Sequence, residues 1–248
     1  MSSEGEQDDP IKAGSEIAFV GYYLSVDFYP QIKMQRTSAI DFARDVQSAM
    51  EVEGAALESN QWKFNGAGVC DGMSVVVERR SISFGVSPPG NNLEFYDHRF
   101  ESILNAFQQA FSLEAMLNSN AMAQGLVPVS GDARVFLGAG IMLMHPQKLA
   151  AIDRSLHILG VRLYFPPDDV EWGVDVKVES WAEDTSMLFI EADADWRGAR
   201  PFDGESIVKA VNGLSTVKDF MNTRLLAFLH QSPALGLDDE NNQGGHNE

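Results

Sequence analysis

Cysteine is almost absent from this sequence, which has Cys70 alone among its 248 residues. A single cysteine excludes an internal disulfide, and together with a few scattered histidines it does not complete a typical zinc site. Folds that depend on disulfides belong to oxidising compartments. We therefore expect a cytoplasmic protein.

Long apolar runs are also missing. Nowhere do about 18 apolar residues follow one another, as a transmembrane helix requires. The N-terminal stretch MSSEGEQDDP is polar and acidic, and it lacks the basic start and apolar core of a secretory signal. The sequence therefore predicts no membrane partner.

Basic residues are few, since 18 Lys and Arg stand against 36 Asp and Glu, for a net charge of −18. Residues 1–9 and 238–248 contain acidic residues but no basic ones. Binding to nucleic-acid phosphates needs clustered Lys and Arg, so we expect no nucleic-acid partner. The acidic surface favours solubility and leaves open a basic protein partner or a metal ion.

The common catalytic signatures are missing as well. The chain has no GxSxG elbow, no phosphate-binding GxxxxGK[ST] loop and no HExxH helix. Gly138-Ala139-Gly140 lacks the third glycine of a dinucleotide-binding fingerprint, and we interpret it as a place of close packing within a strand. These observations exclude the familiar sites that depend on those motifs.

What the sequence does contain is a series of strand and helix patterns. Residues 17–28 are rich in aromatic and β-branched side chains and predict a strand. Ser38 and Asp41 resemble a capping box, which predicts a helix over about 38–52. A second helix is expected to begin at Asp97 and to extend to about residue 122. Between the helices, strands are expected at 61–64, 69–77 and 81–86.

The same order of elements then starts again. The sequence predicts a strand over 134–144 and a helix whose apolar positions are Leu149, Ile152, Leu156 and Leu159. Three strands are expected at 161–165, 174–179 and 187–195. Asp203 is expected to cap a final helix with a long apolar stripe at Ile207, Val211, Leu214, Val217, Met221, Leu225 and Phe228.

Short motifs recur in the same order in both runs, which indicates an internal duplication. Ala39-Ile40-Asp41 matches Ala151-Ile152-Asp153, and Glu101-Ser102-Ile103 matches Glu205-Ser206-Ile207. We predict an α+β fold of two pseudo-repeated β-α-β(β)β-α halves, with antiparallel sheets and helices packed on one face. The expected boundaries are a disordered acidic tail at 1–13, halves at 14–124 and 133–233, a linker at 125–132 and a second disordered acidic tail at 234–248.

A row of carboxylates at Glu191, Asp193 and Asp195 is the most suggestive chemical pattern. Alternate side chains of a strand share a face, so the three are expected to project together. Such a row suits a hard divalent cation or a general base. The alternative is the solvated outer face of an antiparallel sheet, and nearby Arg197 and Arg200 favour it because they neutralise part of the charge.

Cys70 is the other candidate reactive group. A nucleophilic cysteine needs a neighbouring base, and His98, His145 and His157 are the histidines that we consider for that role. We favour the alternative, in which Cys70 is a small core residue and the histidines have capping or surface roles.

Two functions remain open for this sequence. The first is a non-catalytic, acidic binding protein whose partner is another protein or a second copy of the chain. The second is a carboxylate-based, metal-assisted enzyme with Glu191, Asp193 and Asp195 at the junction of the two halves. A broad apolar surface favours the first function, and a deep cleft with convergent polar groups favours the second.

Overall fold

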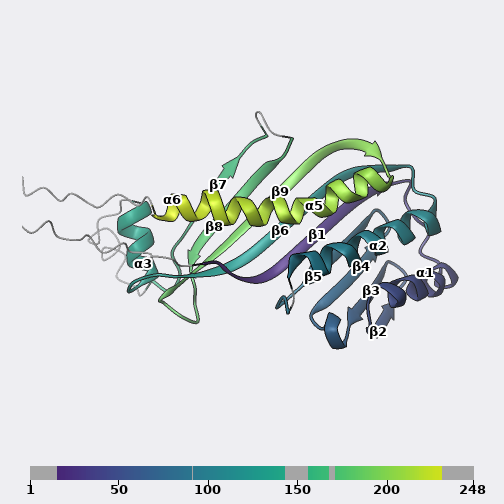
Figure 1. Ribbon diagram of the computed structural model, residues 1–248, viewed down its shortest axis with the longest axis horizontal. Coiled ribbons are helices and arrows are strands. Elements are labelled where there is room, and N and C mark those ends of the chain that lie inside the picture. The colour runs from purple at the N-terminus through teal and green to yellow at the C-terminus, as the bar shows by residue number, and fades with distance from the viewer. Residues whose placement is uncertain (1–15, 91, 143–155, 168–170, 231–248) are drawn as a thin grey trace, which may run out of the picture.

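Nine strands form one antiparallel sheet in the computed structural model (Figure 1), which describes residues 16–90, 92–142, 156–167 and 171–230. The strands are β1 (Ala18–Tyr29), β2 (Val52–Leu57), β3 (Gln61–Gly66), β4 (Met73–Glu78), β5 (Ser81–Val86), β6 (Ala115–Pro128), β7 (Gly160–Phe165), β8 (Gly173–Ser180) and β9 (Met187–Pro201). Their order across the sheet is β2-β3-β4-β5-β1-β6-β9-β8-β7. An antiparallel sheet combined with helices confirms the α+β class expected from the sequence.

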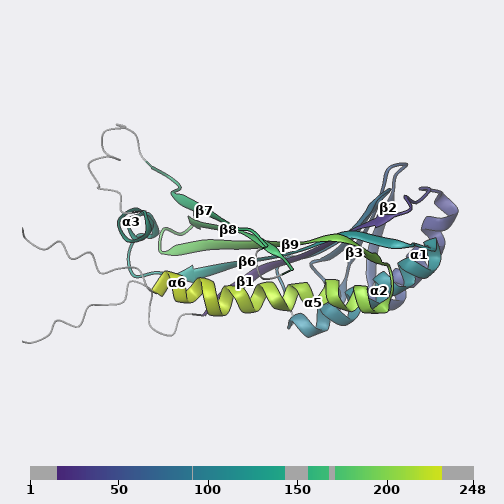
Figure 2. The same ribbon diagram turned by 90° about the horizontal axis from the view of Figure 1, so that it is seen from above.

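Helices and short helical turns connect the strands. They are α1 (Arg36–Ala49), η1 (Gly68–Cys70), α2 (Leu93–Phe111), α3 (Ala133–Val135), η2 (Phe136–Ile141), α5 (Gly204–Phe220), η3 (Met221–Leu225) and α6 (Leu226–His230). Figure 2 shows α2 and α5 along the same side of the sheet. Within the described residues, none of these helices has the length and apolar character needed to cross a membrane.

β1 and β6 form the centre of the sheet and join its two sides. They pair along almost their whole length, from Ala18 opposite Leu126 to Tyr29 opposite Ala115. On β1, buried residues alternate with partly exposed ones. This alternation is expected of a strand with one face against the core and one face toward solvent.

Small side chains allow α5 to lie close to the centre of the sheet. The inward positions of β6 and β9 beneath it are fully buried alanines, namely Ala121, Ala123, Ala192 and Ala194. A Cβ atom on Gly213 of α5 would lie 3.0 Å from the ring of Trp196, so a larger residue at this position would require the ring to shift. The close approach explains why a central strand is built from small residues.

An aromatic cluster joins α1 and α2 to the sheet. The Phe42 ring of α1 lies 5.2 Å from the Phe107 ring and 6.0 Å from the Phe111 ring of α2. On the sheet side, the Phe42 and Phe64 rings are 5.9 Å apart, and Trp62 lies 5.9 Å from Phe111. Phe42 therefore fills the space between α2 and β3.

The chain after α2 forms a strand where the sequence predicts a continued helix. α2 ends at Phe111 because Ser112 adopts a left-handed conformation with φ 49°, which terminates helices. β6 follows, although the apolar residues Leu113, Met116 and Leu117 suggested that the helix continues, because pairing with β1 and β9 and packing beneath α5 decide this segment. Residues 125–128 of the expected linker are the last residues of this central strand.

The predicted strand over 134–144 is wrong, because this segment is helical through Ile141 in α3 and η2. Asp132 starts the helix, since its carboxylate accepts a hydrogen bond from the Arg134 backbone N–H at 2.8 Å. A short apolar run does not distinguish a buried helix from a buried strand. Gly138-Ala139-Gly140 consequently lies in a helical turn.

Two predicted helix starts are also wrong, and one is confirmed. α2 begins four residues before the predicted start, and the Asn92 side chain caps it by accepting from the Phe95 N–H at 3.0 Å. α1 begins at Arg36 without a side-chain cap, so Ser38 and Asp41 do not form a capping box. Asp203 caps α5 as expected, since it accepts from the Ser206 N–H at 2.9 Å.

The predicted strands other than 134–144 are confirmed with shifted ends, and β2 was not predicted. β4 begins only at Met73, because residues 68–70 form the turn η1. Of the helix expected around Leu149 and Ile152, residues 149–155 lie outside the described residues. Residues 156–159 have no regular secondary structure.

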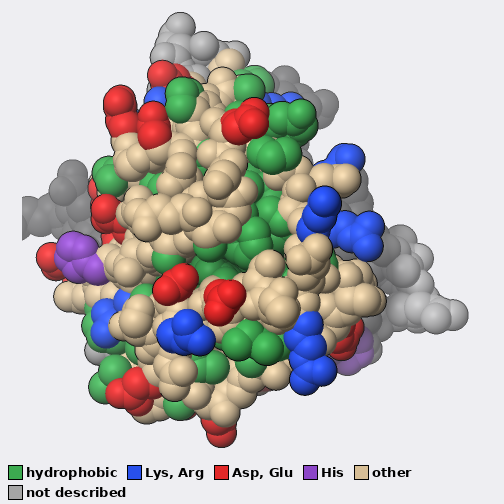
Figure 3. All heavy atoms as spheres, turned by 90° about the vertical axis from the view of Figure 1, so that its right-hand side faces the viewer, with side chains coloured by type: hydrophobic (Ala, Val, Ile, Leu, Met, Phe, Trp, Pro, Cys, Tyr) green, Lys and Arg blue, Asp and Glu red, His purple; other side chains and the backbone are tan. Residues whose placement is uncertain are grey.

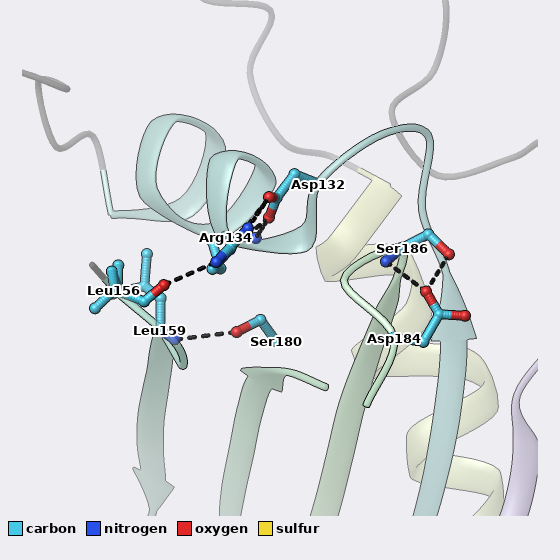
Figure 4. Close-up of polar contacts among 7 residues, drawn as sticks. All are labelled: Asp132, Arg134, Leu156, Leu159, Ser180, Asp184 and Ser186. Carbon is cyan, nitrogen blue, oxygen red and sulfur yellow. Dashed lines mark hydrogen bonds and ion pairs between the residues drawn. The ribbon is translucent and has the colours of Figure 1, made fainter. Parts of the chain in front are cut away.

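Polar contacts tie α3 to the start of β7 (Figure 4). Arg134 pairs with Asp132 and donates from Nη1 to the Leu156 carbonyl at 2.8 Å. The Leu159 N–H donates to the buried Ser180 hydroxyl at 3.0 Å. At the turn before β9, the Ser186 N–H and hydroxyl both donate to Asp184. These contacts fix where the edge strand β7 enters the sheet.

Charged side chains of both signs are scattered over the end of the molecule that carries α1 (Figure 3). Apolar side chains show near the middle of this face, between the basic and acidic ones. This face therefore presents a mixture of charges around an apolar centre.

Candidate functional site

The carboxylates of Glu191, Asp193 and Asp195 share one face of β9, as the sequence predicts. Each is only partly exposed, and each already has a side-chain partner. Gln124 donates to Glu191 at 2.6 Å, Asn120 donates to Asp193, and Arg197 pairs with Asp195. A divalent cation would have to displace or share these contacts.

Burial raises the pKa of Asp193, and the neighbouring carboxylates of Glu191, Asp175 and Asp195 raise it further, while the Asn120 hydrogen bond opposes the shift. Asp175 lies directly opposite on β8 and is itself paired with Arg162. Among the described residues, no group of three or more His, Cys, Asp or Glu side chains is arranged to hold a metal ion. The row has the character of a partly neutralised sheet surface.

The candidate nucleophile Cys70 and the histidines considered with it are distributed over different parts of the fold. Cys70 is buried in η1, between β3 and β4. His98 is exposed on α2, with Nε2 3.9 Å from a Glu94 carboxylate oxygen. His157 is exposed before β7, and His145 lies outside the described residues. A buried thiol is the arrangement expected of a small core residue.

A half-buried carboxylate that the sequence did not single out for chemistry lies where α2 meets the core. Burial raises the pKa of Asp97 to about 6, although the positive charges of His98 and Lys218 lower it. One of its carboxylate oxygens is buried without a hydrogen-bond partner among the described residues. Nearby Tyr22 has its pKa raised to about 12, chiefly by burial.

An apolar groove opens between the last helix and the outer strands of the sheet. Its volume is about 740 Å³. On the sheet side it is lined by Leu163 and Phe165 of β7 and by Val174 of β8. Pro166 and Trp172 belong to the connection between these two strands and close one end.

The helix side of the groove comes from the C-terminal end of the long helix. Phe220, Leu225 and Phe228 line it, and Arg224 is its charged residue. The Phe220 ring lies 5.9 Å from the Trp172 ring and 6.4 Å from the Phe165 ring, so the two walls meet at its base. Trp172 in turn packs against Trp196 at 5.8 Å, which links the groove to the core.

Two aromatic residues of the groove remain unusually exposed. Phe165 is 48% exposed and Phe228 is 41% exposed. Large apolar side chains that flank a concave surface are typical of sites that bind another molecule. Their exposure makes this groove, rather than the carboxylate row, the candidate functional site.

Sequence reasoning found part of the groove without recognising it. Phe228 is the last residue of the predicted apolar stripe, and it is 41% exposed although Leu225 in the same stripe is buried. Phe165, Trp172 and Phe220 come together only in the folded chain. The length of the stripe was therefore the one available signal.

Comparisons with known proteins do not supply a function. No protein-family model matches the chain, and no curated protein is found to be similar in sequence. The functional inference therefore rests on the site itself.

Proposed function

We propose that this is a non-catalytic binding protein that holds a segment of another protein in the apolar groove. The exposure of Phe165 and Phe228 on opposite walls carries the proposal. Aromatic anchors beside a single arginine are the composition of binding hot spots. The net charge of −18 would keep the free protein soluble.

We further propose that the fold arose by duplication, with the helices of both halves on one face of the shared sheet. Outward from the central pair, the strand order is β1, β5, β4, β3, β2 on one side and β6, β9, β8, β7 on the other. Both sides place the first strand of the half at the centre and its last strand next to it. This common order supports a duplication in which β6 is the first strand of the second half, whereas the boundaries at 14–124 and 133–233 expected from the sequence place β6 in the first half.

A metal-assisted enzyme has less support. Glu191, Asp193 and Asp195 are occupied by amide and guanidinium partners, and they lie on the sheet rather than in a described cavity. A cytoplasmic location remains part of the proposal, because a chain with one buried thiol has no need of an oxidising compartment.

Site-specific photo-crosslinking tests the proposal. A benzoyl-phenylalanine residue would replace Phe228 or, as a matched control, Val208, which is 40% exposed on the same long helix outside the groove. We expect illumination in cells to attach a specific protein at position 228 and not at 208. Phe165→Ser in the same chain should abolish the adduct. Equal labelling at both positions would show that the groove is not the binding site.

A further inference from the structure

In the first half of the fold, a helix covers the space between the long helix α2 and the strand β3. There, α1 lies over α2 and β3, and its Phe42 is fully buried among Phe64, Phe107 and Phe111. The apolar stripe of α1 is Ala39, Phe42 and Val46, at helical positions i, i+3 and i+7. One amphipathic helix is therefore enough to close this position.

β7 holds the corresponding position in the second half. Counted outward from the central pair, β3 and β7 are both the fourth strand. The inward residues of β3, Trp62 and Phe64, are buried beneath α1, whereas Leu163 of β7 is only partly buried and Phe165 is exposed. Among the described residues, the place that α1 takes in the first half is open in the second and forms the groove.

We infer that the groove binds an amphipathic α-helix of the partner protein, seated on β7 and the end of the long helix as α1 is seated on β3 and α2. This inference rests on the proposed function and specifies its ligand. The bound helix would present an aromatic residue at the centre of an i, i+3, i+7 stripe, as α1 presents Phe42. Helix-in-groove recognition of this kind depends on such regularly spaced apolar anchors.

The groove also favours one charge on the bound helix. Arg224 is exposed at its edge, and among the described residues no acidic side chain lines it. An Asp or Glu beside the apolar stripe would pair with this guanidinium. α1 has that composition, because Asp41 and Asp45 are exposed one helical turn apart, beside Phe42. A peptide with the α1 sequence is therefore a suitable first probe.

The experiment measures binding of a fluorescent peptide of residues 35–50 to the full chain by anisotropy. A hydrocarbon staple at positions 44 and 48, both exposed in α1, holds the peptide helical. We expect saturable binding that Phe228→Ser weakens at least about tenfold, as loss of an anchor residue does, while Val208→Ser leaves it unchanged. Arg224→Gln should weaken binding less and remove most of its salt dependence.

Two control peptides test whether the helix itself is recognised. Phe42→Ala in the stapled peptide removes the central anchor and should reduce the affinity at least about tenfold. An unstapled peptide with Ala43→Pro keeps the apolar side chains but cannot form the helix, and it should not bind. Equal binding of the proline peptide would overturn the helical ligand.

The outcomes separate this inference from the proposed function. Specific crosslinking at position 228 without competition by the stapled peptide would refute the helix and leave the groove as a binding site. If neither specific crosslinking at position 228 nor binding of the stapled peptide were observed, the proposed function and the helical ligand would both be refuted. Binding that appears only after Ile152→Ser or after removal of residues 231–248 would assign the groove to that segment of the chain. A dimer that Phe228→Ser dissociates would assign it to a second copy, and either result would overturn the inference.

Discussion

Asp97 shows how the fold can change the acid–base behaviour of one side chain. Because burial raises its pKa to about 6, the folded protein binds a proton at this carboxyl more tightly than the unfolded chain does. The stabilisation from this proton is complete below the ordinary carboxyl pKa and is lost as the pH rises through about 6. At neutral pH the charged carboxylate therefore opposes folding.

Replacement of Asp97 by Asn should remove this pH dependence. We expect Asp97→Asn to raise the free energy of unfolding at pH 7.5 by on the order of 1 kcal/mol, a value reduced because the group is partly exposed to solvent. At pH values near 4 the variant and the natural chain should be nearly equal. Urea unfolding across this range measures the difference.

Asp41→Asn is the matched control, because Asp41 is exposed on α1. It should shift the stability by less than about 0.5 kcal/mol at every pH. A constant difference between Asp97→Asn and the natural chain from pH 4 to pH 7.5 would contradict the assignment, because it would reflect packing rather than titration.

Asp193 offers a test of the metal-assisted alternative. Because burial disfavours its charged form, Asp193→Asn should leave stability unchanged or raise it by up to about 1 kcal/mol at pH 7. The amide oxygen can still accept from Asn120. We expect no change in melting temperature with Mg²⁺, Mn²⁺ or Ca²⁺.

A bound metal would give a different result. At a hundredfold excess over its dissociation constant, it would stabilise the fold by about 2.7 kcal/mol. If that gain appeared in the natural chain and disappeared in Asp193→Asn, the carboxylate row would become the leading site.

At the scale of elements, replacing a phenylalanine by alanine should have different effects on stability in α1 and in the groove. Phe42→Ala should cost about 3–5 kcal/mol, because it leaves a cavity between α1, α2 and β3. Phe228→Ala should cost less than about 1 kcal/mol, because this ring is already partly in solvent. Chemical denaturation of the two variants compares them directly. A large cost for Phe228→Ala would mean that the groove is filled by the protein itself.

The strands that sequence patterns predicted well are those in which exposure decides the residue types. β1 and β9 alternate core and surface side chains, and that alternation can be read directly. The sequence pattern did not predict β6 as a strand, because its buried positions beneath α5 are alanines, which the close approach of that helix requires. The helix at α3 and η2 could not be read either, since it is apolar on both sides.

The candidate site was less accessible to sequence analysis than the fold. Phe165 and Phe220 are far apart in the chain, and only the pairing of β7 with β8 and the path of α5 bring them together. The carboxylate row was found because its spacing is local, but its partners Asn120 and Gln124 come from another strand. Local patterns predict which side chains share a face, and not what that face contacts.

On the scale of the whole molecule, the continuous sheet predicts a gradient of stability from centre to edge. β1 and β6 are paired on both sides, whereas β7 has β8 alone as its neighbour. Amide exchange should be slowest at the central residues Val26 and Ala121 and roughly hundredfold faster in β7, where local opening disrupts fewer contacts. Exchange measured by NMR tests this.

Amide exchange in β7 and in the central strands can also be compared with and without a ligand bound in the groove. Binding should slow exchange in β7 and leave the central pair unchanged, because only the edge gains contacts. If β1 and β6 exchanged as fast as β7, the two sides of the sheet would not behave as one cooperative unit.

The central place of β1 has a consequence for biosynthesis. Its residue Val26 pairs with Ile82 on one side and with Ser119 on the other, so β1 leaves the ribosome before either of its neighbours and must wait for residues 81–86 and 115–128. Until β6 has been translated, at least one edge of β1 can hydrogen-bond to another nascent chain. Such distant pairings also slow folding. The yield of native protein should therefore depend on how long this strand is kept apart from other copies, and a ribosome-associated chaperone that holds it should raise that yield.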